Sequence, residues 1–218
     1  MKIVFVSDTH CQHRRINVPD GDVFVHAGDF LLSGNMDELA SLQDFNTWLG
    51  ELPHKHKLLT FGNHDRMMEM MPAMRAEITN ARVFVDQWVE VDGVSFYLSP
   101  WTPRFPEGSD YWKFMRERDQ MHTIWERIPP RTDVLVTHGP PYGVLDMTPY
   151  GRAGDEALRK VVARVRPRIH AFGHIHEGYG QLQYWEARPP AGTSTRFFNC
   201  SQVDAAYRLV NKPWVVEL

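Results

Sequence analysis

The amino-acid sequence predicts an α/β protein in which two mixed β-sheets pack face to face with helices on the outside. Two patterns support this fold class. Short apolar runs alternate with a helical stretch early in the chain, whereas hairpin-type strands come later. The chain has 218 residues, which suits one large domain with a substantial core. We therefore expect a single domain over residues 1–218.

Strands and one helix are predicted in the first hundred residues. Asn35 is the expected N-cap of the helix, with Glu38 completing a capping box and Gly50 ending it. The dipeptide Asp92-Gly93 predicts a tight hairpin turn. The predicted strands are Lys2–Val6, Asp22–His26, Lys57–Phe61, Arg82–Val85, Trp88–Val91 and Val94–Leu98.

Two helices and five strands are predicted in the second half of the chain. Tyr111–Ile128 is predicted to be helical because two prolines follow it. Asp155 is the expected N-cap of another helix that runs to Val165 and buries an apolar stripe. The predicted strands are Asp133–Val136, Arg168–Phe172, Tyr179–Trp185, Arg196–Asn199 and Trp214–Glu217.

Composition excludes several classes of function. The chain is 43% hydrophobic and 23% charged, with a net charge of −3 and scattered basic residues, so no extended nucleic-acid surface is expected. No apolar run is long enough to cross a membrane, and the apolar N-terminal run is too short for a secretion signal. Cys11 and Cys200 are too few for a disulfide framework. We expect a cytoplasmic protein and leave its oligomeric state open.

Polar side chains follow five of the apolar runs, at the points where the predicted strands end. The carboxyl ends of strands line the ligand crevice in α/β sheets, so these side chains are candidate ligands. They offer oxygen and nitrogen donors without a thiolate, which suits Mn, Fe, Zn or Mg rather than a cysteine-type zinc site. His26 and His170 lie inside strands and are expected to be structural. The candidates are Asp8, His10, Asp29, Asn63, His64, His138, His174 and His176.

The number of candidates favours two divalent ions that share one carboxylate. One ion with an open water position needs fewer protein ligands than this set provides. Asp8 and His10, and likewise His174 and His176, are two residues apart, so on an extended backbone each pair would point to the same side. His64 is then surplus and becomes a candidate catalytic group, with Asp65 expected to orient its ring.

These motifs together resemble the calcineurin-like metallophosphoesterases across nearly the whole chain. The resemblance implies a four-layer αββα sandwich of two mixed β-sheets flanked by helices, with a dinuclear centre between the sheets. It implies that Asp8, His10, Asp29 and His176 hold one metal, and that Asp29, Asn63, His138 and His174 hold the other. His64 would stabilise the transition state or protonate the leaving oxygen. The motifs are Asp8-Thr9-His10, Gly28-Asp29, Gly62-Asn63-His64-Asp65, Thr137-His138-Gly139 and Gly173-His174-Ile175-His176.

A closer likeness links the chain to the small metallophosphoesterase-domain proteins, which include vertebrate brain proteins and are similar to class III cyclic-nucleotide phosphodiesterases. It rests on His26–Phe30, Ser99–Trp101, His138–Gly143 and His176–Gly180. Some animal members have glycine where His174 stands, so this chain is expected to keep the full dinuclear chemistry.

The resemblance implies hydrolysis of small phosphodiesters, 2′,3′- or 3′,5′-cyclic nucleotides among them, by in-line attack of metal-bound hydroxide without a covalent intermediate. The expected cofactors are two divalent ions, with Mn favoured. The alternatives are a phosphomonoesterase or protein phosphatase, a nuclease, and a non-catalytic scaffold of the same fold. Pocket walls are expected to include Trp101, Tyr142 and the methionine-rich segment Met67–Met74.

Overall fold

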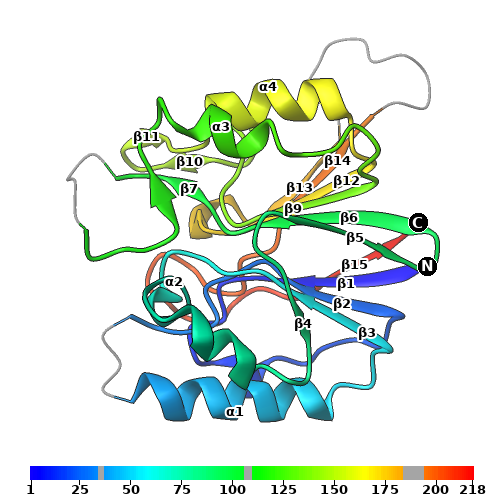
Figure 1. The fold of residues 1–218 in the computed structure, drawn as a ribbon, viewed down its shortest axis with the longest axis vertical. Helices are drawn as coiled ribbons and strands as arrows, with labels where there is room; N and C mark the ends of the chain where they lie inside the picture. Colours follow the sequence, from blue (N-terminus) through cyan, green and yellow to red (C-terminus); the bar gives the residue numbers. More distant parts are fainter. Residues whose placement is uncertain (34–36, 106–109, 184–193) are drawn as a thin grey trace.

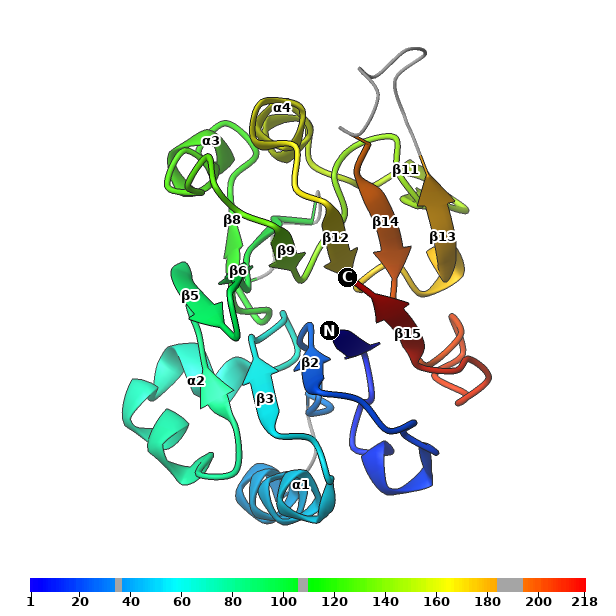
Figure 2. The same ribbon diagram turned by 90° about the vertical axis from the view of Figure 1, so that its right-hand side faces the viewer.

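The computed structural model describes residues 1–33, 37–105, 110–183 and 194–218. Two large mixed sheets lie face to face, with helices on both outer sides (Figure 1). Helices α1 (Glu38–Glu51) and α2 (Arg66–Met70) lie outside the first sheet. Helices α3 (Met121–Trp125) and α4 (Glu156–Val165) cover the second, as Figure 2 shows with the strands seen nearly end-on. The predicted fold class, a layered α/β sandwich of two mixed sheets, is confirmed.

Parallel strands form the centre of each sheet. The first sheet has the order β15-β1-β2-β3-β4, with β15 antiparallel to β1. The second has the order β13-β14-β12-β9-β6-β5, with antiparallel pairs at its two edges. The carboxyl ends of the parallel strands therefore meet at one end of the molecule, opposite the chain termini in Figure 1. The strands are β1 (Lys2–Val6), β2 (Val23–His26), β3 (His56–Leu59), β4 (Arg82–Val83), β5 (Gln87–Val91), β6 (Val94–Ser99), β9 (Val134–Thr137), β12 (Ile169–Phe172), β13 (Gly180–Gln183), β14 (Arg196–Asn199) and β15 (Trp214–Glu217).

Alternate side chains of a central strand enter two different apolar cores. Ile3 and Phe5 of β1 pack between the two sheets, whereas Val4 and Val6 pack on the helix side. Successive side chains of a strand point to opposite faces, so a strand that is buried on both faces is apolar throughout. This burial explains why residues 3–6 of β1 form an unbroken hydrophobic run in the sequence.

Helix α1 starts and ends later than predicted. Asn35 lies outside the described residues, and the N-cap is Asp37, whose carboxylate accepts the Ala40 N–H at 2.9 Å. Glu38 is therefore the first helical residue and does not complete the expected capping box. The helix passes Gly50 and ends at Glu51 because Leu52 precedes a proline, which disfavours helical backbone at Leu52.

The predicted helix Tyr111–Ile128 is wrong for most of its length. Phe114 has a φ of 51°, and its N–H donates to the Glu69 carboxylate instead of to a helical carbonyl. The next residues form β8 (Met115–Arg116), which pairs with β7 (Thr102–Pro103). The helical part of this segment is α3. The contact between Phe114 and Glu69, rather than local helix propensity, sets the backbone conformation before it.

The other elements follow their predictions closely. Asp155 caps α4 by accepting the Leu158 N–H at 2.6 Å. The turn between β5 and β6 has positive φ at both central residues, 47° at Asp92 and 81° at Gly93. The strand predicted over Tyr179–Trp185 forms β13, and its last two residues lie outside the described part of the chain. No helix within the described ranges combines the length and the apolar content that a membrane crossing needs.

Candidate metal centre

The candidate ligands converge where the parallel strands of both sheets end. They follow β1, β2, β3, β9 and β12 in the sequence and come from both layers of the sandwich. Six of them are buried, and the last two histidines are half-buried. The structure thus brings all the predicted side chains to one place: Asp8, His10, Asp29, Asn63, His64, His138, His174 and His176.

Two groups of side chains within this cluster could each hold a metal ion. Within each group the donor atoms lie within 4.8 Å of one another. The first group is Asp8, His10 and His176, and the second is Asp29, His138 and His174. The Asn63 side-chain oxygen lies 3.1 Å from His138 Nε2, beside the second group. His10, Asp29 and His64 also meet this criterion, so His64 is close enough to both groups to act on the same substrate.

Backbone carbonyls fix the orientation of three of the histidines. A ring N–H that donates to a carbonyl leaves the lone pair on the other nitrogen, which then faces the cluster. The short distances between the inward nitrogens and their neighbours, such as 3.3 Å between the Nε2 atoms of His10 and His176, mark where a cation fits. The Nδ1 donors and their acceptors are His10 to Leu31 O at 3.1 Å, His138 to Ala27 O at 2.9 Å, and His176 to Asp204 O at 3.2 Å.

The backbone around the cluster is held in an uncommon conformation. Asp8, His10, Asp29 and His174 have φ values of 52°, 42°, 56° and 67°. Each such residue costs about 1–3 kcal/mol, which folds retain at functional sites when the surrounding structure enforces it. The expected extended backbone at Asp8 and His10 is therefore wrong, because left-handed turns aim these side chains inward. His174 and His176 face different groups.

Two glycines leave the space that the cluster needs. A Cβ atom at Gly62 would collide with an Asp29 carboxylate oxygen and with the His138 ring. A Cβ atom at Gly173 would collide with the Asp8 carboxylate and the Ser7 side chain. The oxygen and nitrogen donors, the lone pairs that face into the cluster and the space left by the two glycines all suit divalent cations.

Burial and charge set the protonation of the cluster. Burial lowers the pKa of His10 to about 4 and that of His174 to about 3, so both rings are neutral at neutral pH. Burial acts in the same direction on His138, but the Asp29 carboxylate outweighs it and raises the His138 pKa to about 9. The Asp29 pKa stays well below its ordinary value because, against burial, His138 and His64 stabilise the carboxylate. Positive charge is therefore stabilised beside Asp29.

His64 differs from the other histidines of the cluster. Its Nδ1 accepts the Ser33 N–H at 3.4 Å, so the neutral ring carries its proton on Nε2. The Nε2–H points toward the Tyr207 hydroxyl at 3.3 Å, and the Trp112 ring lies 4.5 Å from the imidazole centroid. His64 thus presents a proton, rather than a lone pair, to the cavity.

Asp65 does not orient the His64 ring as expected. Among the described residues, its carboxylate accepts three backbone N–H groups, from Asp29 at 2.8 Å, Leu31 at 2.9 Å and Gly62 at 2.9 Å. It therefore ties the loop after β2 to the loop after β3.

The cavity at the cluster has different walls from those expected. It measures about 190 Å³ and is lined in part by His64, Phe105, Trp112 and Tyr207. Tyr207 was not among the predicted site residues, because no sequence motif marks it. It lies in a turn with a φ of 58° and contacts the rings of His10, His64 and His176.

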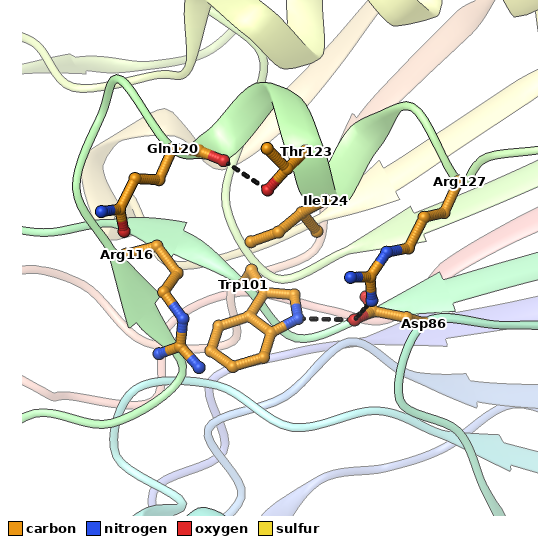
Figure 3. A pocket seen from close by; sticks show the side chains of 7 residues that line it. All are labelled: Asp86, Trp101, Arg116, Gln120, Thr123, Ile124 and Arg127. Carbon is orange, nitrogen blue, oxygen red and sulfur yellow. Dashed lines mark hydrogen bonds and ion pairs between the residues drawn. The ribbon is translucent and has the colours of Figure 1, made fainter.

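Trp101, an expected wall, lines a separate cavity of about 430 Å³ (Figure 3). There its indole N–H donates to Asp86 at 2.8 Å, and Arg116 stacks on the ring. Tyr142 lines another cavity, and Met67–Met74 forms α2 and the 3-10 turn after it, with Met68 buried. None of these residues lines the cavity at the cluster among the parts of the chain that the structure describes.

Replacing Gly62 with alanine is expected to reduce metal binding and to destabilise the fold by about 1–3 kcal/mol, because the new methyl group overpacks Asp29 and His138. Elemental analysis and thermal unfolding measure the two effects. Gly93→Ala is the matched control, since its Cβ meets nothing within 4 Å and suffers only backbone strain. Normal metal content in Gly62→Ala would contradict the placement of the site.

Comparisons with known proteins agree with this geometry. The sequence profile described as "Calcineurin-like phosphoesterase" matches residues 1–178. The human and mouse proteins named "Metallophosphoesterase domain-containing protein 1" are each 36% identical to the chain over 245 aligned positions, covering 100% of this chain and 71% of theirs. The crystal structure of TT1561 of Thermus thermophilus shares the fold, with a TM-score of 0.60 at 12% identity, covering 99% of this chain and 97% of that one.

Proposed function

The chain belongs to the calcineurin-like phosphoesterase family, and we propose that it is a metal-dependent phosphodiesterase that hydrolyses small phosphodiesters, cyclic nucleotides among them. One observation carries the proposal. Two groups of inward-facing oxygen and nitrogen donors lie beside His64, a neutral histidine that presents its proton to the same cavity. Residues 1–218 form one catalytic domain in this proposal, and a cytoplasmic location stays a prediction from the sequence.

Each polar residue of the cluster has a role in the proposal. Asp8, His10, Asp29 and His176 bind one ion, while Asn63, His138 and His174 bind the second and share Asp29 with the first. Two divalent ions, when bound, lower the pKa of water and stabilise charge on phosphoryl oxygens. A donor set of imidazole, carboxylate and amide groups suits Mn, Fe, Zn or Mg, and Mn is the ion that we propose.

The chain's own groups position the substrate and stabilise the leaving oxygen. The carbonyls of Leu31, Ala27 and Asp204 keep three imidazoles in the tautomer that binds cations. The Nε2–H of His64 donates a hydrogen bond to the leaving oxygen and stabilises the negative charge that develops there as the bond from phosphorus to that oxygen breaks. The cavity at the cluster borders a larger groove, so both substituents of a diester find room.

A hydrolysis panel tests the class of reaction. We expect turnover of bis-p-nitrophenyl phosphate to exceed that of p-nitrophenyl phosphate, to vanish in EDTA and to return with Mn²⁺, because both donor groups need a divalent ion. Cyclic nucleotides complete the panel, and His138→Ala serves as the control for contaminating phosphatase.

The rival functions give other results. A clear preference for the monoester would favour a phosphomonoesterase. Turnover in EDTA would remove the metal-dependent mechanism altogether. Full metal content without turnover of any ester would favour a non-catalytic scaffold.

A further inference from the structure

The cavity at the cluster is too small for a whole nucleotide diester. Its volume of about 190 Å³ is below the roughly 300–1,000 Å³ of ordinary small-molecule sites. The donor groups and His64 line it, so it suits the scissile phosphoryl group itself. The organic part of the substrate must therefore extend beyond it.

A larger groove continues from this cavity. It measures about 690 Å³ and runs past Arg118 to β10 (Met147–Thr148) and β11 (Gly151–Arg152). The two cavities are adjacent because five residues line both of them. The shared residues are Phe105, His174, Glu177, Ala205 and Tyr207.

Arg118 is held in place on the wall of the groove by backbone carbonyls. Its guanidinium donates to Gly154 O at 3.1 Å and to Ala153 O at 3.2 Å. The loop that provides these carbonyls is itself fixed by Asp146, a fully buried residue whose carboxylate accepts the Gly143 N–H at 2.8 Å and the Gly154 N–H at 3.3 Å. A guanidinium has five N–H donors, so Arg118 keeps donors for a ligand.

Of the three arginines that line the groove, Arg118 is the one without an ion pair to a described carboxylate. Arg104 is paired with Asp110 and Glu117, and Arg152 is paired with Asp146. For Arg118, no carboxylate of the described residues lies within ion-pair distance. The buried carboxylate of Asp155 senses its charge but is occupied by the Leu158 N–H and the Trp125 indole.

Aromatic side chains line the groove together with Arg118. The Phe105 ring stacks on His174 with 5.6 Å between centroids and 16° between planes. Tyr150 is 100% exposed and lines the same groove. Planar bases bind to such rings without sequence preference. Glu177 lines the part of the groove next to the cluster, so a second anion that binds in the groove is favoured at Arg118 rather than beside this carboxylate.

We propose that the groove is a substrate subsite for a nucleoside whose second phosphate binds Arg118. The preferred substrates are then phosphodiesters that carry a further anionic group one nucleoside away from the scissile phosphorus. This inference rests on the proposed function, because it assumes that the scissile phosphate sits at the cluster. A guanidinium binds phosphate through two parallel N–H donors, which gives the subsite its selectivity.

Two p-nitrophenyl esters that differ in one phosphate test the subsite. They are thymidine 5′-(p-nitrophenyl phosphate) and the same ester with a 3′-phosphate, and both release p-nitrophenol from the same diester. We expect kcat/KM to be about tenfold higher for the 3′-phosphorylated ester, as a charged hydrogen bond at a partly exposed site provides. Arg118→Gln should remove this preference and leave the other ester unchanged.

Arg164→Gln is the matched control, because it removes the same charge from the exposed side of α4 and should keep the preference. Equal kcat/KM for the two esters in the unchanged protein, or a preference that survives Arg118→Gln, would overturn the subsite.

A binding measurement distinguishes failure of the subsite from failure of the proposed function. If neither ester releases p-nitrophenol, the phosphodiesterase proposal fails, and calorimetry then tests the subsite alone. With Mn²⁺ present, thymidine 3′,5′-bisphosphate should bind about tenfold more tightly than thymidine 5′-phosphate, and Arg118→Gln should make the two equal. Equal binding by the unchanged protein would exclude the subsite whatever the catalytic result.

Discussion

Replacing His64 with alanine is expected to lower kcat by about 10²–10³-fold, the range for loss of a hydrogen-bond donor to charge that develops in the transition state, while metal content stays near that of the unchanged protein. The structure gives the reason for this separation. The Nδ1 of His64 accepts a backbone N–H, so its proton is on Nε2, whereas three candidate ligands have the opposite arrangement. Steady-state kinetics and elemental analysis of the same preparations measure both quantities.

The leaving group provides the second readout for His64. A good leaving group such as p-nitrophenolate disperses its own charge and needs little stabilisation, so its hydrolysis should suffer less than that of an alkyl ester. His122→Ala, which removes an exposed histidine from α3, is the control and should change neither rate. An equal loss for both leaving groups would argue against a hydrogen bond from His64 to the leaving oxygen, and a loss of bound metal would make His64 a ligand of the group that includes His10 and Asp29.

Replacing His174 with glycine is expected to reduce bound metal from near two ions to near one per chain at limiting metal, with activity falling in parallel. The variant removes one donor from the group that contains Asp29 and His138 and leaves the other group intact. The fold should survive, because residue 174 has a φ of 67°, which glycine adopts without strain, and its backbone N–H still reaches Asp8 at about 3.0 Å. Metal stoichiometry and activity against Mn²⁺ concentration test this.

The variant His174→Phe distinguishes the loss of a metal ligand from the loss of aromatic packing. It keeps an aromatic ring for the stacking contact with Phe105 but has no nitrogen donor. Both variants should therefore bind about one ion, and excess Mn²⁺ should restore part of the rate of His174→Gly by mass action. Two tightly held ions and full activity in either variant would show that His174 belongs to neither site and that the donor groups must be reassigned.

The sequence alone determined the strands and the position of the cluster. A strand that is buried on both faces is mostly apolar, so β1, β2, β9 and β12 can be recognised from the sequence without any knowledge of their neighbours, and β3 is recognised from the apolar residues at its end. A polar residue directly after such a strand has to lie at its carboxyl end, where parallel strands meet. These are local facts of the chain, and the structure brings the eight predicted side chains together accordingly.

Only the tertiary structure decided which contacts the residues around the cluster make. Phe114 turns away from a helix because its N–H finds Glu69, 45 residues earlier in the chain. Tyr207 meets His64 across 143 residues, and the Arg118 guanidinium is held by carbonyls 35 and 36 residues later. Asp65 follows His64 directly, yet its carboxylate binds loop amides instead of the ring. Periodicity and turn chemistry report on neighbours within a few residues, whereas these contacts form between loops that come together only when the two sheets pack.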